Sequence, residues 1–304
     1  MCDSDCLWGQ SCNDRTACES QILKCAAWAE RGCIVIPSEL NQNHRAISVT
    51  PSDASKSIEE KLTAASGKPV LIHCDPNFAG HASIKIASDD SPAHLLRYKP
   101  EFESELPYLS AFQCGMALRS IQAKTVNRFE LASAPAMGHE VKLLIEEHLR
   151  KSGSGVPMSV VPQLCQQLGH GLGLQLRSMP IAIRVDEWLY QDYPALANLQ
   201  RKSIERQLQE AMNALGPSVR AFAPQRIIDA NVGMSCAFAK FWAATWNEPE
   251  VAVPFTSAGY GKVGDELLGL VQTLDRSPDG DRELVNQWSE RLGLTDWFQT
   301  IDKQ

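Results

Sequence analysis

Thiol side chains are concentrated at the start of the chain. Six of the ten cysteines lie within the first 33 residues, and four thiolates are enough to bind zinc or an iron–sulfur cluster. If this segment holds either cofactor, the expected ligands are Cys6, Cys12, Cys18 and Cys25. The spacing contains no Cys-x-x-Cys pair, so it also fits small buried thiols and no cofactor.

Two later cysteines are poorly placed for nucleophilic catalysis. Cys74 follows His73 in a predicted strand, where adjacent side chains point to opposite faces. Cys114 falls in the middle of a predicted helix, away from the N-terminal dipole that would lower the pKa of its thiol. We therefore expect no thiol enzyme.

The helix that contains Cys114 has an apolar stripe. In "YLSAFQCGMALRS", Tyr108 to Ser120, the residues Leu109, Phe112 and Met116 fall at i, i+3 and i+7. This spacing predicts a core-facing stripe on an amphipathic helix.

The same stretch resembles the active-site helix of the zincin metallopeptidases. "YLSAFQCGMALR" is similar to a Tyr-Leu-x-Ala-His-Glu-x-Gly-His-x-Leu-Arg helix, in which two histidines bind zinc and the glutamate is the general base. "ASIKIAS" and "HLLRYKPE" precede the helix as the strands of that fold do. The resemblance extends from Ala82 to Pro194 and implies a zincin-like fold.

The resemblance places Phe112 and Met116 at the histidine positions and Gln113 at the glutamate position. None of these side chains suits the zinc chemistry, because phenylalanine has no lone pair, a thioether is a soft ligand, and an amide is no base near pH 7. Asp186 and Glu187 stand where a downstream carboxylate ligand would arise. The resemblance thus implies a pseudo-peptidase without a cofactor, whose former-site pocket, lined by these five residues, holds a peptide or protein partner.

Two other functions remain open. The chain could hydrolyse peptides with metal ligands recruited from His139, His148, His170, Asp186 or Glu187. It could instead sense metal or redox state through zinc or an iron–sulfur cluster on the N-terminal cysteines.

Local signals predict the elements that position these residues. Thr50, Pro51 and Asp53 predict a capped helix start, and Gly67 predicts the end of that helix. "KPVLIHCD", "HASIKIAS" and "AHLLRYKP" predict three strands, and "CIVIP" at 33–37 predicts another. Further helices are predicted near 15–31, 103–123, 138–151, 162–177, 184–190, 194–215, 231–246, 262–274 and 282–292.

These elements predict an α+β fold, with a small N-terminal sheet and helices followed by a mainly helical body. The expected organisation is a cysteine-rich leader at 1–33, an α/β zincin-like part with the degenerate motif helix at 34–130, and a helical body at 131–304. We expect four tryptophans to seal that body: Trp242, Trp246, Trp288 and Trp297.

The charge and apolar patterns disfavour some classes of partner. The 304-residue chain has a formal net charge of −7, and its basic residues are scattered, which argues against nucleic acid. No window of about 18 apolar residues and no apolar leader is present, so we expect no membrane span and a cytoplasmic protein with reduced thiols.

Overall fold

The first described helix has the predicted capping box. The computed structural model describes residues 49–153 and 156–303, and the predictions for 1–48, including the cysteine-rich leader, lie outside them. Helix α2, Pro51–Ser66, begins after Thr50, whose Oγ1 accepts the N–H of Asp53 at 3.2 Å while the Asp53 carboxylate accepts the N–H of Thr50 at 3.1 Å. Gly67 ends the helix in the left-handed region, with φ of 73°, so this prediction is confirmed.

A small mixed sheet follows α2. It consists of β1, Val70–Cys74, β2, Ala82–Lys85, and β3, His94–Tyr98, in the order β1-β3-β2. Strand β1 runs parallel to β3, and β2 runs antiparallel to it. All three strands lie within the predicted runs.

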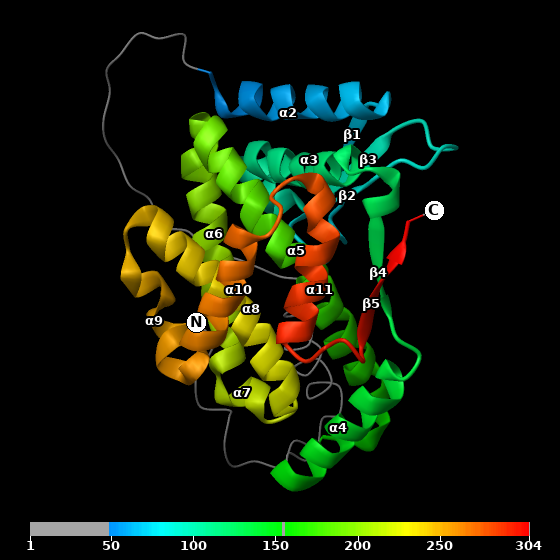
Figure 1. Ribbon diagram of the computed structural model, residues 1–304, viewed down its shortest axis with the longest axis vertical. Coiled ribbons are helices and arrows are strands. Elements are labelled where there is room, and N and C mark those ends of the chain that lie inside the picture. Colours follow the sequence, from blue (N-terminus) through cyan, green and yellow to red (C-terminus); the bar gives the residue numbers. More distant parts are fainter. Residues whose placement is uncertain (1–48, 154–155, 304) are drawn as a thin grey trace.

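Helix α3, Leu106–Gln122, carries the zincin-like motif. It follows the 3₁₀ helix η2, Pro100–Glu105, and packs against α2, the sheet and the long helix α5, Val161–Asp192. Figure 1 shows α2 lying across the top of the molecule with α3 directly beneath it. The motif helix is therefore enclosed from several sides.

Helices form most of the remaining chain, as predicted. They are α4 Met137–Ser152, α6 Ala197–Ala211, α7 Pro217–Arg220, α8 Gln225–Trp246, α9 Val253–Phe255, α10 Gly261–Thr273 and α11 Asp281–Arg291. Short turns connect them: the 3₁₀ helices η3 Thr125–Asn127, η4 Met158–Val160, η5 Pro194–Leu196, η6 Met212–Leu215, η7 Pro249–Ala252 and η9 Pro278–Gly280, and the π-helical turn η8 Thr256–Tyr260.

Helix α5 corrects one prediction. The two helices predicted at 162–177 and 184–190 are one helix of 32 residues with Pro180 inside it. Proline removes a backbone donor and favours a break. Here Leu176, Ile181 and Ile183 on both sides of Pro180 are buried in the same core, and this packing keeps the two halves continuous.

Two further strands were not predicted. Strand β4, Phe129–Ser133, pairs antiparallel with β5, Phe298–Asp302, near the end of the chain. Figure 1 shows this two-stranded ribbon along one side of the helical body. Each strand is short, and more than 160 residues separate the two strands in the sequence. No turn between neighbouring strands could therefore predict their pairing.

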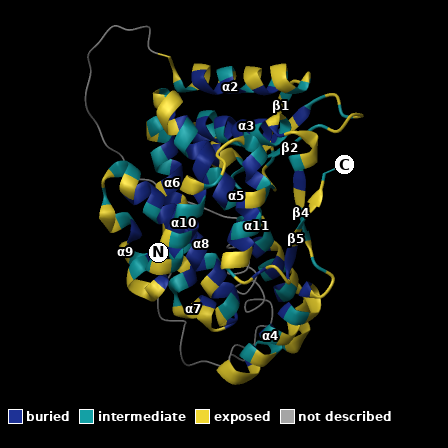
Figure 2. Cartoon of the chain, in the orientation of Figure 1, coloured by how far each residue is buried: buried dark blue, intermediate teal, exposed yellow. Residues whose placement is uncertain are grey.

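One buried apolar cluster runs through the described part of the chain. It includes Ile58 of α2, Leu96 of β3 and Phe298 of β5, so the sheet region and the helical body share a core, and the predicted boundary at residue 130 stays a prediction. Three of the four tryptophans are fully buried and Trp246 is partly buried, packing near Trp242 at 4.8 Å between ring centroids. Figure 2 shows the buried residues on the inward sides of the helices.

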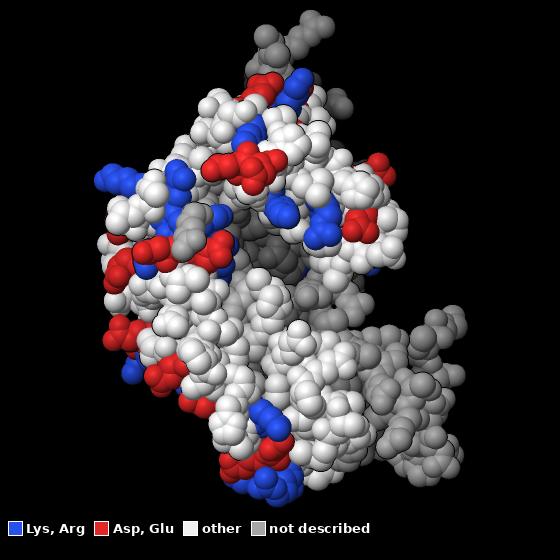
Figure 3. All heavy atoms as spheres, turned by 90° about the vertical axis from the view of Figure 1, so that its right-hand side faces the viewer, with Lys and Arg blue, Asp and Glu red and all other residues white. Residues whose placement is uncertain are grey.

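The surface carries charges of both signs. On the face drawn in Figure 3, Lys and Arg lie beside Asp and Glu, and charged residues are sparse over part of the lower half.

Within residues 49–153 and 156–303, no helix has the length and apolar character needed to cross a membrane. The α+β class is confirmed.

Candidate functional site

The core side of α3 differs from the predicted stripe. Leu109 of the stripe is buried as predicted, together with Ala111, Cys114, Gly115 and Leu118, whereas Phe112 and Met116 are only partly buried. Small side chains lie where α2, α5 and the sheet come closest. The two largest apolar residues of the stripe therefore lie at the margin of the core, with part of each side chain accessible.

Gln113 is bonded to the sheet. Its Nε2 donates a hydrogen bond of 3.1 Å to the carbonyl oxygen of Ala82, the first residue of β2. An ionised glutamate at this position could not donate, because a carboxylate only accepts hydrogen bonds. The amide thus ties α3 to the strand.

Asp186 is held in a buried polar cluster. Its Oδ1 accepts bonds from Tyr108 Oη at 2.8 Å and from Gln200 Nε2 at 3.0 Å. Burial raises the pKa of Asp186 to about 7, although both hydrogen bonds act to lower it. The same burial, with the neighbouring carboxylate, raises the pKa of Tyr108 well above its ordinary value.

Glu187 lies next to Asp186 but has different partners. Its Oε2 forms an ion pair with Arg276, and its Oε1 accepts a bond of 3.4 Å from Gln191. Phe112 is near the Asp186 cluster through Tyr108, whose ring centroid is 6.0 Å from that of Phe112. Tyr108 thus connects Phe112 with Asp186. Gln113 is bonded instead to Ala82, and Glu187 is paired with Arg276.

Gly115, which matches the glycine of the zincin-like motif, lets α3 approach α5 closely. A Cβ added here would lie 2.8 Å from Val185 Cγ1 and 3.3 Å from Trp188 Cζ3. Val185 is buried and β-branched, so its methyl group cannot move aside easily. The glycine thus has a packing role that the sequence comparison alone did not reveal.

We expect Gly115→Ala to lower the free energy of unfolding by up to about 2 kcal/mol, because overpacking costs about 1–3 kcal/mol and alanine returns about 1 kcal/mol of helix propensity. Urea denaturation followed by circular dichroism measures this change. Gly269→Ala in α10 is the matched control, since nothing lies within 4 Å of its added Cβ, and it should stabilise the protein slightly. Equal effects at the two sites would contradict the close packing.

The histidines considered as recruited ligands differ in exposure and in hydrogen bonding. His139 and His170 are exposed, and Nε2 of His148 lies 2.9 Å from the carbonyl oxygen of Arg220. Within residues 49–153 and 156–303, no three His, Cys, Asp or Glu side chains form a group that could hold a metal ion. The recruited-ligand hypothesis and the metal-sensing hypothesis on Cys6, Cys12, Cys18 and Cys25 stay predictions.

The two cysteines set aside in the sequence have distinct environments. Cys114 is fully buried, and burial together with the nearby Glu59 carboxylate raises the pKa of its thiol to about 12. Cys74 is exposed on β1. A buried, protonated thiol at Cys114 agrees with the expectation that it is no nucleophile.

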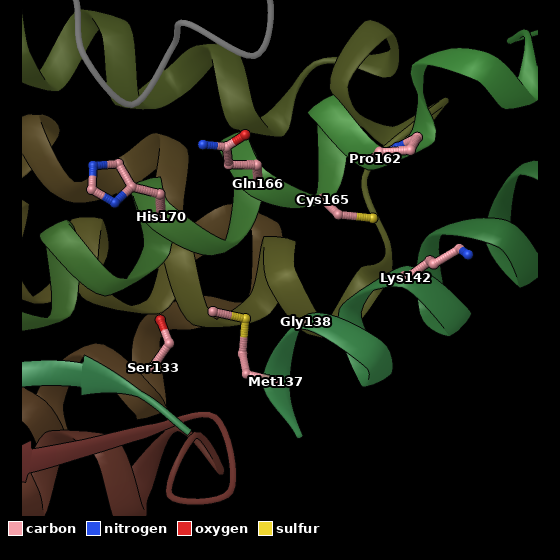
Figure 4. Close-up of a pocket in the computed structure, with 8 residues that line it drawn as sticks. All are labelled: Ser133, Met137, Gly138, Lys142, Pro162, Cys165, Gln166 and His170. Atoms are coloured by element: carbon pink, nitrogen blue, oxygen red, sulfur yellow. The ribbon is translucent and has the colours of Figure 1, made fainter. Parts of the chain in front are cut away.

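A separate pocket lies between α4 and α5, about 450 Å³ in volume. Figure 4 shows its lining residues on α4, on α5 and at the end of β4, with Met137 between the two helices and His170 on α5. Burial, together with the Glu146 carboxylate, raises the pKa of Cys165 in its wall, although the nearby Lys142 acts to lower it. Sequence reasoning missed this pocket because its walls come from three separate elements. Of its lining residues, only His170 had been considered as a site residue.

The glycines around His170 act in packing. A Cβ on Gly173 would lie 2.7 Å from Cε1 of Phe298, and a Cβ on Gly169 would lie 3.2 Å from Sδ of Met137. Gly169 and Gly173 therefore allow close packing around this part of α5, whereas the side chain of His170 is exposed. No protein-family model, curated protein or solved structure matches this chain.

Proposed function

We propose that this chain is a cytoplasmic, catalytically inactive protein with a zincin-like scaffold, and that it binds an extended peptide or protein segment beside α3. The observation that carries the proposal is the hydrogen bond from Gln113 to Ala82 O, at the position where the resemblance places the general base. An amide that donates through its NH₂ group keeps its own carbonyl oxygen as an acceptor. Gln113 therefore suits recognition of a backbone better than proton transfer.

The open edge of β2 offers the backbone groups for such recognition. Lys99 N–H donates to His81 O at 3.1 Å, so in the antiparallel ladder residues 81, 83 and 85 face β3. Ala82 and Ile84 then direct their N–H and C=O groups away from β3, and no described strand pairs with that side. The C=O of Ala82 already accepts the bond from Gln113, so the N–H of Ala82 and both backbone groups of Ile84 remain for an added strand. An extended segment can add to such an edge as a further strand.

Apolar side chains accompany this edge. Met116 lies three residues after Gln113, so the two side chains share a face of α3. Met116 and Ile84 are only partly buried, and a methionine side chain adapts to different apolar partners. These features favour an extended segment with apolar side chains at alternating positions.

The remaining former-site positions also support binding over hydrolysis. The Asp186 carboxyl is committed to Tyr108 and Gln200, and the Glu187 carboxylate is committed to Arg276. Both groups are thus occupied by contacts within the fold. Phe112, with no polar atom in its side chain, contributes apolar surface instead of a ligand.

Selection of a displayed random-peptide library against the full chain tests this proposal, with fluorescence anisotropy of the selected peptide as the readout. In an added strand, the amides of every second residue face β2 and the intervening amides face away. We therefore expect N-methylation of the first set of amides to abolish binding and N-methylation of the second set to preserve it. Ala82→Pro should weaken binding, because it removes an N–H that faces away from β3.

Ile72→Pro is the matched control, because it removes an outward N–H at the opposite edge of the sheet. Equal loss of binding in both proline variants, or binding that is insensitive to the parity of N-methylation, would contradict strand addition at β2. The peptide should be recovered intact by mass spectrometry. Chelator-sensitive cleavage that depends on Glu187 would favour the peptidase alternative.

A further inference from the structure

The other edge of the sheet, β1, lacks the usual protection of an edge strand. Edge strands commonly carry a charge or proline that discourages pairing with another chain. The five residues of β1, Val70–Cys74, include neither, whereas the four-residue strand β2 ends with Lys85. Strand β1 is thus the edge better suited to pairing with another strand.

The hydrogen bonds of the ladder show which β1 residues face outward. His94 N–H donates to Pro69 O at 2.9 Å, and Asp75 N–H donates to Tyr98 O at 2.8 Å. In a parallel pair, the N–H and C=O groups of every second residue point to the neighbouring strand. The backbone groups of the odd-numbered residues 69 to 75 therefore face β3. Val70, Ile72 and Cys74 direct their backbone groups to the free side, where no described strand pairs with them.

Both faces of β1 are exposed. Leu71 is 56% exposed on one face of the sheet, and Ile72 is 43% exposed on the other, where the helices lie. Leu96, the register partner of Ile72 on the neighbouring strand, is fully buried. The helical layer therefore covers β3 but leaves most of β1 uncovered by described residues.

We propose that β1 pairs antiparallel with β1 of a second copy of this chain, about a two-fold axis at Ile72. The outward residues Val70, Ile72 and Cys74 are symmetric about Ile72, so Ile72 meets its own counterpart and Val70 meets Cys74 of the partner subunit. Each facing pair exchanges N–H···O bonds in both directions, so three pairs give about six bonds. The two sheets become one continuous six-stranded sheet.

Self-complementarity favours a second copy over an unrelated strand. A two-fold contact must match itself, and the ladder does so without placing like charges opposite each other, because β1 carries no carboxylate, lysine or arginine. On the helix side, the two Ile72 side chains cover each other. On the opposite face, Leu71 packs beside His73 of the partner subunit. This assembly is independent of peptide binding at β2, on the far edge of the sheet.

Sedimentation velocity of the full chain over a range of concentrations tests the pairing. We expect a reversible dimer and an increase of at least about tenfold in its dissociation constant for Ile72→Lys, which sets two like charges directly opposite each other. Leu143→Lys is the control, since Leu143 is 50% exposed on α4, which Figure 1 shows at the opposite end of the molecule from β1, and it should leave the dimer unchanged.

Oxidative cross-linking tests the register. Ile72→Cys should yield a disulfide between copies through position 72, identified by peptide mapping, because facing residues of a strand pair lie within disulfide range. Leu71→Cys is the matched control: its counterpart lies diagonally across the axis, about 7–8 Å away, and should not cross-link.

Three results would overturn the proposal. A chain that stays monomeric at all concentrations has no such dimer, and a dimer that Ile72→Lys leaves unchanged uses another surface. Slow hydrogen exchange of the Ile72 and Cys74 amides in a monomer would mean that another segment, such as residues 33–37 of the same chain, occupies this edge.

Discussion

Replacing Asp281 by asparagine should lower the free energy of unfolding by about 3–5 kcal/mol, because it leaves a buried arginine without its counter-charge. The Asp281 carboxylate accepts two bonds of 2.7 Å from Arg119, and it also forms an ion pair of 3.0 Å with Arg184. The Arg184 side chain is 1% exposed. When the Asp281 carboxylate is removed, the Arg184 charge stays buried without a negatively charged partner.

The ion-pair cluster joins distant parts of the chain. Arg119 is in the last turn of α3, Arg184 is in α5, and Asp281 begins α11. Arg184 also donates to the carbonyl oxygen of Asp275 at 2.7 Å, and Arg119 donates to that of Ser277 at 3.0 Å. Loss of the carboxylate therefore weakens the contact of the motif helix with the C-terminal helices.

Urea denaturation of Asp281→Asn measures the loss, and Asp265→Asn is the control. Asp265 pairs with Lys240 at 2.6 Å, but its side chain is 68% exposed. An exposed pair contributes at most about 1 kcal/mol, so the control should change little. Comparable losses in the two variants would show that burial of the Arg184 charge does not govern the stability of this cluster.

Local signals in the sequence predicted the early part of the fold. The capping box of Thr50 and Asp53 and the glycine at residue 67 operate within one or two helical turns, so they can be recognised from neighbouring residues. The three strands of the sheet were likewise recognised by their composition and alternation. These features depend little on the rest of the chain.

Contacts between distant residues could not be predicted in this way. Tyr108 bonds to Asp186 across 78 positions, and Arg119 bonds to Asp281 across 162 positions. Nothing in a single sequence pairs these residues. The β4–β5 ribbon was missed for the same reason.

The candidate site shows a related limit. The pattern of Leu109, Phe112 and Met116 correctly indicated a helix and the burial of Leu109, but Phe112 and Met116 lie at the margin of the core instead of at its centre. Three neighbours approach α3, and close approach favours Ala111 and Gly115 over bulky residues. A site placed at the edge of a helix contact depends on these neighbours, which hydrophobicity alone does not specify.

The buried carboxyl of Asp186 should make the stability of this protein depend on pH between about 4 and 7. Its pKa is about 7 in the folded chain, against an ordinary value of 3.8, so the folded state binds an additional proton in this interval. Stability from this group is then fully present below about pH 4 and is lost as the pH rises to about 7. The full difference is on the order of 4 kcal/mol.

Asp186→Asn should remove this dependence, because an amide cannot ionise and its oxygen can still accept bonds from Tyr108 and Gln200. We expect the variant to match the natural chain near pH 4 and to be more stable by several kcal/mol near pH 8, measured by urea denaturation at each pH. Tyr108→Phe removes a hydrogen bond that lowers the pKa of Asp186, so it should shift the midpoint of the pH dependence upward. Parallel profiles for the natural chain and Asp186→Asn across this interval would mean that Asp186 is ionised at no cost in the folded protein, and the carboxylate would again be a candidate for ligand binding.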